Sequence, residues 1–413
     1  DGKIETFSEG AQKLFGYTEN EIVGKGRVSD FSSGEIVLGH VVNWLAESVD
    51  KGKWEGETVF LHKDGHEMPC KIKITPTKDI DGNHIGYCGV TSPLKDKTAD
   101  VVRPKINFST KLFCWMVIMR LPFLTATIVP ILLGAAVASR YVTIDWFYFT
   151  LTMLGGFFLH IGTNTSNDYF DHTSGTDEAN YNYMVPFSGG SRSIQMGLIS
   201  AKGMLNLSII TFALSALIGI PLIMKAGINI LYLGFIGFLS GFFYTAPPFR
   251  FASRKGIGEL LIGLNFGPLM VAGSYLVQTG GDMTKINDAI FAGIPIGLLV
   301  AAIVYVNQFP DHDGDKATGK NNLVVVFGPE KARVGYVFLV IGSFISIIAL
   351  ALTKPESFPM LTLISLITSF YSIYTIKTLY KYYDNRLLQP ANAGTIGLHF
   401  LTGLFFCVGI WLG

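Results

Sequence analysis

The sequence predicts a multi-domain protein in which a small α/β domain precedes an all-helical bundle that crosses a membrane. The chain of 413 residues is 49% hydrophobic and 15% charged, and its mean hydropathy is +0.40, which is too apolar for an ordinary soluble protein. The apolar residues are unevenly distributed: residues 1 to about 104 have a soluble composition, and long apolar runs follow. The net charge of +1 gives no indication of nucleic-acid binding.

Residues 1–93 alternate short strands and helices. We expect strands at Lys3–Ser8, Trp54–His62, Met68–Thr77 and His84–Ser92, and helices at Glu9–Phe15, Glu19–Val23 and Ile36–Val49. Asp-Gly occurs in both turns between the last three strands, and this pair is a strong hairpin signal. The chain starts without a methionine inside a strand-like pattern, so we interpret it as a fragment or a processed form.

Histidines and cysteines give no sign of a metal centre in the sequence. The histidines of the first part are not at metal-ligand spacing, and we interpret them as surface or turn residues: His40, His62, His66 and His84. The cysteines show no CxxC spacing, and we expect buried thiols in a reducing compartment: Cys70, Cys88, Cys114 and Cys407.

Residues 94–111 are charged, contain Pro104 and are predicted to be a linker. Residues 112–413 contain repeated apolar runs of about 20 residues, the length that crosses a bilayer. We expect about nine membrane-spanning helices, near 113–138, 144–163, 203–224, 228–246, 257–278, 288–307, 334–353, 358–379 and 395–412.

Loop charges predict the orientation of these spans. The loops after the second, fourth, sixth and eighth spans carry most of the Lys and Arg residues, whereas the loops on the other side carry one each. By the positive-inside rule the basic loops are cytoplasmic. We therefore predict a multi-pass protein of the cell (inner) membrane, whose N-terminal domain and acidic loops face the cytoplasm.

Two acidic stretches follow apolar runs and have helical spacing. Asn164, Asn167, Asp168 and Asp171 lie at offsets of three, four and seven, which is one helical face, and Asp177 follows. In the second stretch Asn307, Asp311 and Asp315 are spaced by four. Carboxylates at the end of a membrane helix are costly unless they are used or paired.

Asp and Asn oxygens suit Mg²⁺, which prefers a few carboxylates together with phosphate oxygens and water. The two stretches therefore predict a site for Mg²⁺ and a diphosphate. The predicted metal ligands are Asn167, Asp168, Asp171, Asp311 and Asp315, and we assign a catalytic role to the four aspartates among them. The predicted substrate-binding residues are Asn164, Asn167, Asp177, Arg192, Lys202, Tyr244, Lys255, Asn307 and Lys320.

The N-terminal part, residues 1–93, resembles a PAS domain. The resemblance depends on the opening DGKIETFSEGAQKLFGYTENEIVGK, the hairpin WEGETVFLHKDGHEMP and the end GNHIGYCGVTSPL. It implies a small sensor or dimerisation module, with self-association as one role. We favour an interaction module without a cofactor.

Residues 112–413 resemble the UbiA family of intramembrane aromatic prenyltransferases. The resemblance depends on Arg120-Leu121-Pro122, NDYFDHTSGTD, YTAPP at Tyr244–Pro248, and NQFPDHDGD followed by Lys320. It implies nine spans around a cavity in which two Asp-rich motifs bind Mg²⁺ and an isoprenyl diphosphate. The family transfers the isoprenyl group to an aromatic acceptor.

Within this family the sequence is most similar to the 1,4-dihydroxy-2-naphthoate branch of menaquinone synthesis. Asp171 and Asp177 are six residues apart, Gly258–Gly280 resembles that branch, and Pro186–Ser200 partly matches its loop. The resemblance implies prenylation with loss of carbon dioxide. The residues whose rings could stabilise an allylic cation are Tyr169, Phe170 and Tyr244.

Several alternatives stay open. Another acceptor, such as homogentisate, a chlorophyll precursor or a glycerol-phosphate lipid, is compatible with the same motifs. A PAS-regulated membrane sensor or transporter is the alternative from another class of protein. His160 and His172 flank the first motif, and we expect structural roles for them. We also hypothesise that the PAS-like domain modulates access to the cytoplasmic face, because the linker joins it directly to the first span.

Overall fold

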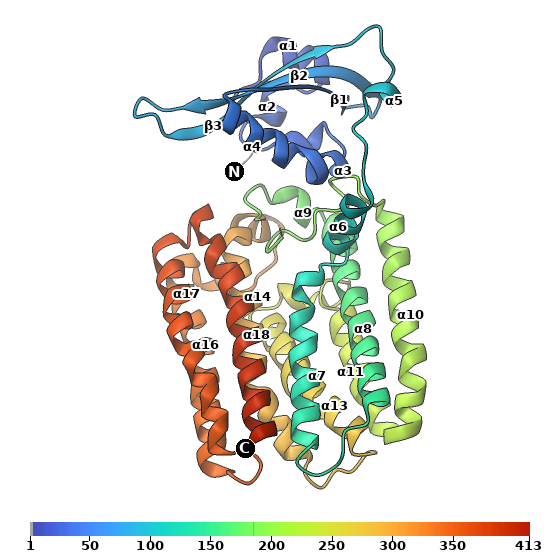
Figure 1. Ribbon diagram of the computed structural model, residues 1–413, viewed down its shortest axis with the longest axis vertical. Coiled ribbons are helices and arrows are strands. Elements are labelled where there is room, and N and C mark those ends of the chain that lie inside the picture. Colours follow the sequence, from blue (N-terminus) through green and yellow to red (C-terminus); the bar gives the residue numbers. More distant parts are fainter. Residues whose placement is uncertain (1–2, 185) are drawn as a thin grey trace. The chain divides into compact units, whose positions relative to one another are not determined.

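The computed structural model describes residues 3–184 and 186–413, and the chain forms two compact units (Figure 1). The first unit comprises Asp1–Ile118 and Arg192–Ser200. The second comprises Met119–Ser191 and Ala201–Gly413. A short segment between two predicted membrane spans therefore clusters with the N-terminal unit.

The first unit is built on an antiparallel sheet with strand order β1-β2-β3. Its strands are β1 (Trp54–Leu61), β2 (Glu67–Lys78) and β3 (His84–Pro93). They agree with the predicted strands to within one residue at each end, and both hairpins are confirmed. The predicted strand at Lys3–Ser8 is wrong. In the described residues this segment forms an isolated bridge between Lys3 and Arg27, and the Ile4 N–H donates to the Gly26 carbonyl at 2.9 Å, before η1 (Val28–Asp30) begins.

The first unit also contains several helices, some of which pack against the sheet. They are α1 (Glu9–Phe15), α2 (Glu19–Ile22), α3 (Gly34–Ile36), η2 (Val37–Val41), α4 (Val42–Lys51), α5 (Ala99–Val102) and α6 (Phe108–Ile118). The Ser8 side chain caps α1 by accepting a hydrogen bond from the Ala11 N–H at 3.2 Å. The core contains Phe7, Phe15, Ile22, Phe31, Phe60, Cys70, Ile72 and Ile74.

Part of the predicted linker 94–111 folds back onto the sheet. Lys97 forms an ion pair with Glu57 at 2.6 Å, and Arg103 forms one with Glu67 at 2.5 Å. The segment between the last strand and α6 is therefore attached to the first unit at two points.

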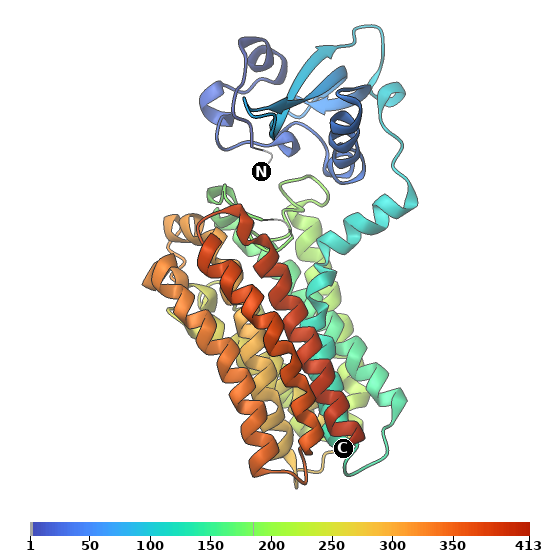
Figure 2. The same cartoon turned by 60° about the vertical axis from the view of Figure 1, so that its left-hand side comes forward.

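The second unit is a bundle whose long helices run side by side (Figure 2). Its helices are η3 (Leu121–Leu124), α7 (Thr125–Ala138), α8 (Trp146–Thr173), α9 (Thr176–Ala179), α10 (Ala201–Ala226), α11 (Ile228–Phe242), η4 (Phe251–Ser253), α12 (Ile257–Leu264), η5 (Asn265–Leu269), α13 (Met270–Gln278), α14 (Ile286–Ala317), α15 (Leu323–Phe327), α16 (Pro329–Thr353), η6 (Met360–Thr368), α17 (Ser369–Tyr382), η7 (Arg386–Leu388) and α18 (Gln389–Leu412).

Within the described residues, seven helical segments are long and apolar enough to cross a membrane: Leu121–Ala138, Ala201–Ala226, Ile257–Gln278, Ile286–Ala317, Pro329–Thr353, Met360–Tyr382 and Arg386–Leu412. They correspond to seven of the nine predicted spans. The predicted span 228–246 forms a helix that ends at Phe242 and is short for a bilayer. The span 144–163 lies in the long helix α8, whose Tyr148 and His160 reduce its apolar character.

α14 is buried along most of its length and forms the centre of the bundle. The interrupted helix α12–η5–α13 packs against it backbone to backbone. A Cβ atom on Gly297 would overlap the carbonyl of Gly263, and one on Gly267 would overlap the carbonyl of Gly293. Such close packing of small residues is typical of membrane helices, where it strengthens van der Waals contact.

A proline inside α14 is compensated by a neighbouring helix. Pro310 has no N–H, so the carbonyl of Val306 loses its usual partner within the helix. The buried side chain of Asn392 on α18 donates to this carbonyl at 3.3 Å and to Asn307 Oδ1 at 2.7 Å. α14 therefore continues through the second acidic stretch without a break.

Candidate active site

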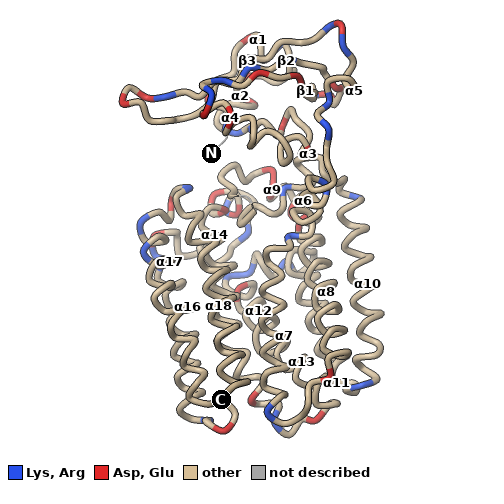
Figure 3. Tube along the Cα trace, viewed as in Figure 1, with Lys and Arg blue, Asp and Glu red and all other residues tan. Residues whose placement is uncertain are grey.

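A polar cavity of about 180 Å³ lies beside the C-terminal parts of α8 and α14. The charged residues of the bundle gather mainly near the helix ends, and most of its length is uncharged (Figure 3). Eight of the predicted site residues line this cavity: Asn164, Asn167, Asp171, Tyr244, Asn307, Asp311, Asp315 and Lys320. The structure thus brings together the two acidic stretches on which the sequence analysis depended.

The first acidic stretch occupies the last turns of α8. Asn164, Asn167 and Asp171 line the cavity, as their shared helical face predicts. Asp168 is buried and forms an ion pair with Arg120 at 2.5 Å. One oxygen of Asp168, Oδ2, is buried without a hydrogen-bond partner. A buried carboxylate oxygen without a partner costs free energy unless a cation or donor satisfies it.

The second acidic stretch occupies the last turns of α14. Asp311 accepts hydrogen bonds from the Asn180 side chain at 2.6 Å and from the Gly189 N–H at 3.0 Å. Asp315 accepts one from the Asn322 side chain at 2.7 Å. The segment between α9 and α10 therefore orients the second motif, although it directly follows the first.

Lys320 connects the two motifs. Its ammonium lies 3.5 Å from Asp171 Oδ2 and 3.6 Å from Asp315 Oδ1. Burial alone would lower the pKa of Lys320, but the carboxylates of Asp171 and Asp315 outweigh this and raise that pKa above its ordinary value. Lys320 is therefore a permanent cation at the cavity.

The donor set fits a magnesium ion. The cavity wall supplies carboxylate and amide oxygens, which are the ligands that Mg²⁺ prefers, and the first motif also contains the unpaired oxygen of Asp168. Both motifs lie at helix C-termini, where the helix dipole favours a cation. Arg120 and Lys320 remain available to contact anionic oxygens of a bound diphosphate.

Gly190 lies where no side chain fits. Its φ is 74°, and a Cβ atom would come within 2.9 Å of Asp168 Oδ1 and 3.0 Å of an Arg120 nitrogen. Asp177, which is buried in α9, also lies next to this position, at 3.3 Å. The backbone at Gly190 therefore packs directly against the first motif.

A larger apolar cavity of about 560 Å³ adjoins the polar one. It is lined by residues of α8, α10, α11 and α12–η5–α13, among them Phe212, Gly237 and Leu269. The two cavities share five lining residues: His160, Thr163, Tyr244, Ile262 and Phe266. A ligand with a polar head and a long apolar tail is therefore accommodated across both.

The remaining predicted site residues lie elsewhere. Lys202 in the first turn of α10 and Lys255 before α12 are exposed and are not among the residues that line the polar cavity. Arg192 begins the short segment that clusters with the first unit. Their roles stay predictions.

The residues at or next to the cavity that the sequence analysis did not assign include Arg120, Asn180, Gln308 and Asn322. Arg120 lies in the Arg-Leu-Pro motif and Gln308 directly follows Asn307, so both carried a local signal. Asn180 and Asn322 had none, because their contacts depend on the path of the chain after each helix.

Residues 127–396 match the UbiA prenyltransferase family, and residues 1–96 match the PAS domain. The chain belongs to the UbiA prenyltransferase family. This confirms the predicted fold class, a UbiA-type membrane bundle preceded by a PAS domain, and it shows that the chain is a prenyltransferase of the membrane. It does not specify the acceptor.

The names of two curated relatives of this UbiA protein refer to naphthoquinone chemistry. The chain is 30% identical over 210 residues to the 1,4-dihydroxy-2-naphthoate octaprenyltransferase of Bacillus subtilis. This alignment covers 51% of this chain and 64% of the relative, so it spans less than two thirds of the relative's length. It is 26% identical over 334 residues to the 2-carboxy-1,4-naphthoquinone phytyltransferase of a Synechocystis species, covering 78% and 98%.

A solved structure, the apo form of a UbiA homolog from Aeropyrum pernix K1, shares the fold. Its TM-score is 0.53 at 14% sequence identity, and the comparison covers 69% of this chain and 97% of that one.

Proposed function

We propose that this UbiA protein transfers the isoprenyl group of an isoprenyl diphosphate to 1,4-dihydroxy-2-naphthoate in menaquinone biosynthesis, with Mg²⁺ as cofactor. One observation carries the proposal. Residues of both acidic motifs line one cavity, and Lys320 contacts a carboxylate of each motif. The names of the two curated relatives support the naphthoate acceptor.

We assign the magnesium ligands to the two motifs: Asn167, Asp168, Asp171, Asp311 and Asp315. Magnesium bound there would neutralise the charge that develops on the departing diphosphate. Lys320 and Arg120 would hold diphosphate oxygens through charge-assisted hydrogen bonds. Asn164 has a buried Nδ2 without a hydrogen-bond partner at the cavity wall, and it offers one more donor.

In the reaction, the bond between C1 of the isoprenyl chain and the diphosphate oxygen breaks, and its electrons leave with the diphosphate. The aromatic carbon of the acceptor that bears the carboxylate then forms a bond to C1. The electrons of the bond to the acceptor carboxylate restore the aromatic ring as carbon dioxide leaves, so no general base has to remove a proton from that carbon. Tyr244 and Phe266 lie where the two cavities meet, and their rings would stabilise the allylic cation.

The apolar cavity is the natural place for the isoprenyl tail, because most of the residues that line it are apolar or glycine. By the positive-inside rule, the basic loops support a cytoplasmic location for the acidic motifs and the PAS domain. We propose that the catalytic part begins near residue 112 and that residues 1–93 serve a regulatory or self-associating role.

Prenyl transfer in nanodiscs tests this function. The full chain would receive Mg²⁺, a long-chain isoprenyl diphosphate and a panel of acceptors: 1,4-dihydroxy-2-naphthoate, 4-hydroxybenzoate, homogentisate and a glycerol-phosphate lipid. We expect product from the naphthoate, abolished in Asp168→Ala and Asp311→Ala. Product only from another acceptor would overturn the acceptor. No product from folded protein would overturn the proposed transfer to this panel and favour a sensory or binding role.

A further inference from the structure

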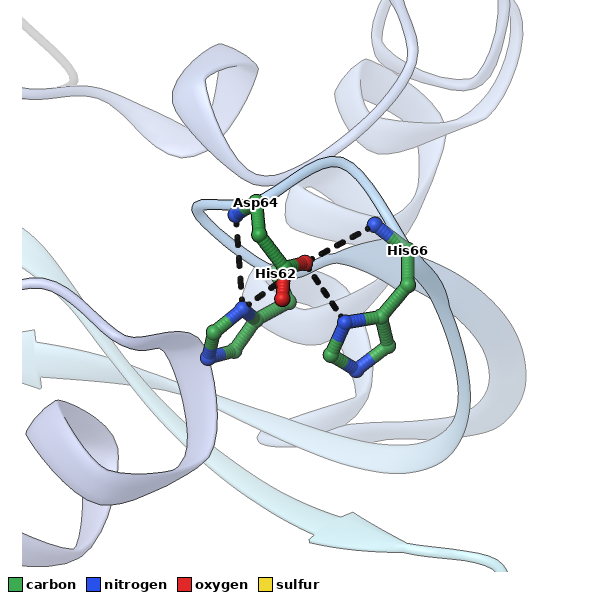
Figure 4. A group of neighbouring side chains, drawn as sticks. All are labelled: His62, Asp64 and His66. Carbon is green, nitrogen blue, oxygen red and sulfur yellow. Dashed lines mark hydrogen bonds and ion pairs between the residues drawn. The ribbon is translucent and has the colours of Figure 1, made fainter.

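The turn between β1 and β2 gathers two imidazoles and a carboxylate (Figure 4). The His62 N–H donates to the His66 carbonyl at 2.9 Å, and the Gly65 N–H donates to the His62 carbonyl at 2.8 Å. This closed turn brings both histidine rings to one side and places Asp64 between them. His62 and His66 flank a turn at the surface, as the sequence analysis interpreted them, but the turn brings them together, which their linear spacing had not indicated.

The potential ligand atoms converge. Asp64 Oδ1 lies 3.0 Å from His62 Nδ1 and 2.6 Å from His66 Nδ1, and the ligand atoms of the three residues all lie within 4.8 Å of one another. Zinc holds nitrogen and oxygen ligands at roughly 2.0–2.2 Å in a tetrahedron, so neighbouring ligand atoms should be about 3.3 Å apart. A small outward movement of the rings is enough to admit such an ion.

His62 is held in place by the helix beside it. A Cβ atom on Gly16, which ends α1 with a φ of 79°, would overlap the His62 ring at Nε2. The Lys63 N–H also donates to the Phe15 carbonyl at 3.0 Å and anchors the turn. The Nδ1 atom of His62 therefore faces Asp64.

The backbone also holds Asp64 in this group. The His66 N–H donates to Asp64 Oδ1 at 3.1 Å. Within the described residues, this is the one group of three His, Cys, Asp or Glu side chains whose ligand atoms come this close together.

We propose that His62, Asp64 and His66 form a binding site for a first-row transition-metal ion of the zinc type. Two imidazole nitrogens and one carboxylate oxygen suit Zn²⁺ and do not suit Mg²⁺. The side chains of Asp64 and His66 are 63% and 58% exposed, so the remaining coordination position faces solvent. The site belongs to the first unit and is independent of the acidic motifs of the second.

Co²⁺ absorption and Zn²⁺ titration of the full chain, both in excess Mg²⁺, test this site. We expect wild-type protein to show the visible absorption of tetrahedral Co²⁺ and to bind one more Zn²⁺ than His66→Gln. We expect His66→Gln to weaken Zn²⁺ binding more than about tenfold. The matched control is His84→Gln, an exposed histidine on β3 of the same unit, which should behave as wild type. His66 is exposed, so its replacement leaves the fold intact. Equal stoichiometry and affinity in wild type and His66→Gln would overturn the proposal.

A second observation concerns the segment between α9 and α10, whose two halves belong to different units. In the second unit, the Ser191 N–H donates to Asp168 Oδ1 at 3.2 Å. In the first unit, the Gly34 N–H at the start of α3 donates to the Met196 carbonyl at 2.8 Å. A Cβ atom on Gly34 would come within 2.7 Å of that carbonyl oxygen and 2.8 Å of Leu198 side-chain atoms.

We further infer that the PAS domain regulates the proposed metal site through this segment, an inference that rests on the proposed function. Ser191 and Arg192 are consecutive, so a displacement of Arg192–Ser200 shifts the Ser191 N–H and the neighbouring Gly189 N–H. These two groups hold Asp168 and Asp311, one from each motif. A signal that changes how α3 holds Met196 is therefore transmitted along the backbone to both motifs.

Gly34→Leu tests the coupling, and Gly10→Leu is its matched control, because a Cβ atom on Gly10 meets only Ser8 Oγ at 3.8 Å. Amide hydrogen exchange at Gly189 and Ser191 is the primary measurement, since it needs no enzyme activity. We expect Gly34→Leu, but not Gly10→Leu, to accelerate exchange at both amides and to change kcat/KM at least about fivefold, a typical coupling magnitude. Unchanged exchange in Gly34→Leu would overturn the coupling. Changed exchange in a protein that transfers no prenyl group would instead overturn the proposed function.

Discussion

The Lys320 ammonium lies 3.5 Å from the Asp171 carboxylate, although 149 residues separate them in the sequence. Asp171 ends the first acidic motif, and Lys320 follows the second. Because Lys320 also contacts Asp315, the protein itself supplies the cation that keeps the two motifs together before a substrate binds. The same ammonium is placed to bind the diphosphate.

Replacing this ammonium should impair catalysis strongly. We expect Lys320→Met to lower kcat/KM for the isoprenyl diphosphate by roughly 10²–10³, the range for removing one donor that stabilises charge in a transition state. Steady-state prenyl transfer at saturating Mg²⁺ measures this. Lys316→Met, which removes an exposed lysine near the end of α14, is the control. Equal loss in both variants would rule out a specific role for Lys320.

Packing of the Gly190 backbone against the first motif leads to a second prediction. Gly190 and Gly175 share a φ of 74°, but a Cβ atom on Gly175 meets nothing within 4 Å. Both alanine variants therefore carry the same backbone strain, about 1–2 kcal/mol, and only Gly190→Ala presses on Asp168 and Arg120. We expect Gly190→Ala to weaken Mg²⁺ activation about tenfold relative to Gly175→Ala. Indistinguishable Mg²⁺ titrations would show that the space at Gly190 is unimportant.

The compensation of Pro310 by Asn392 makes a prediction about stability. Asn392→Leu should leave the Val306 carbonyl unpaired in the bundle and lower the free energy of unfolding by about 1–3 kcal/mol. Pro310→Ala restores a backbone N–H to the helix, so we expect it to recover part of this loss in the double variant. Apparent Tm in detergent measures both effects. Additive losses, without recovery, would contradict this explanation of the unbroken helix.

Much of the fold followed from the sequence because it depends on local patterns. Apolar runs of membrane length predicted most long helices, and the spacing of Asn164, Asn167 and Asp171 predicted one face of α8. The span at 228–246 was predicted too long, since apolar residues continue past Phe242 where the helix ends.

The unpredicted parts depend on contacts between distant segments. The backbone N–H groups of Gly189 and Ser191 hold Asp311 and Asp168, and a backbone group carries no sequence signal. His62 and His66 were interpreted by linear spacing, whereas a closed turn determines where their rings lie. Lys202 and Lys255 were chosen for charge alone, and both are exposed away from the cavity.

The central claim is that the two motifs bind an isoprenyl diphosphate together through Mg²⁺. Equilibrium binding of a labelled isoprenyl diphosphate to the full chain in nanodiscs, with and without Mg²⁺, tests it most directly. The comparison is between Asp311→Asn and Asp313→Asn, because the side chain of Asp313 is 76% exposed in the same motif. We predict that Mg²⁺ strengthens binding in wild type and in Asp313→Asn, and that Asp311→Asn loses this Mg²⁺-dependent part. Equal Mg²⁺ dependence in all three proteins would contradict the claim.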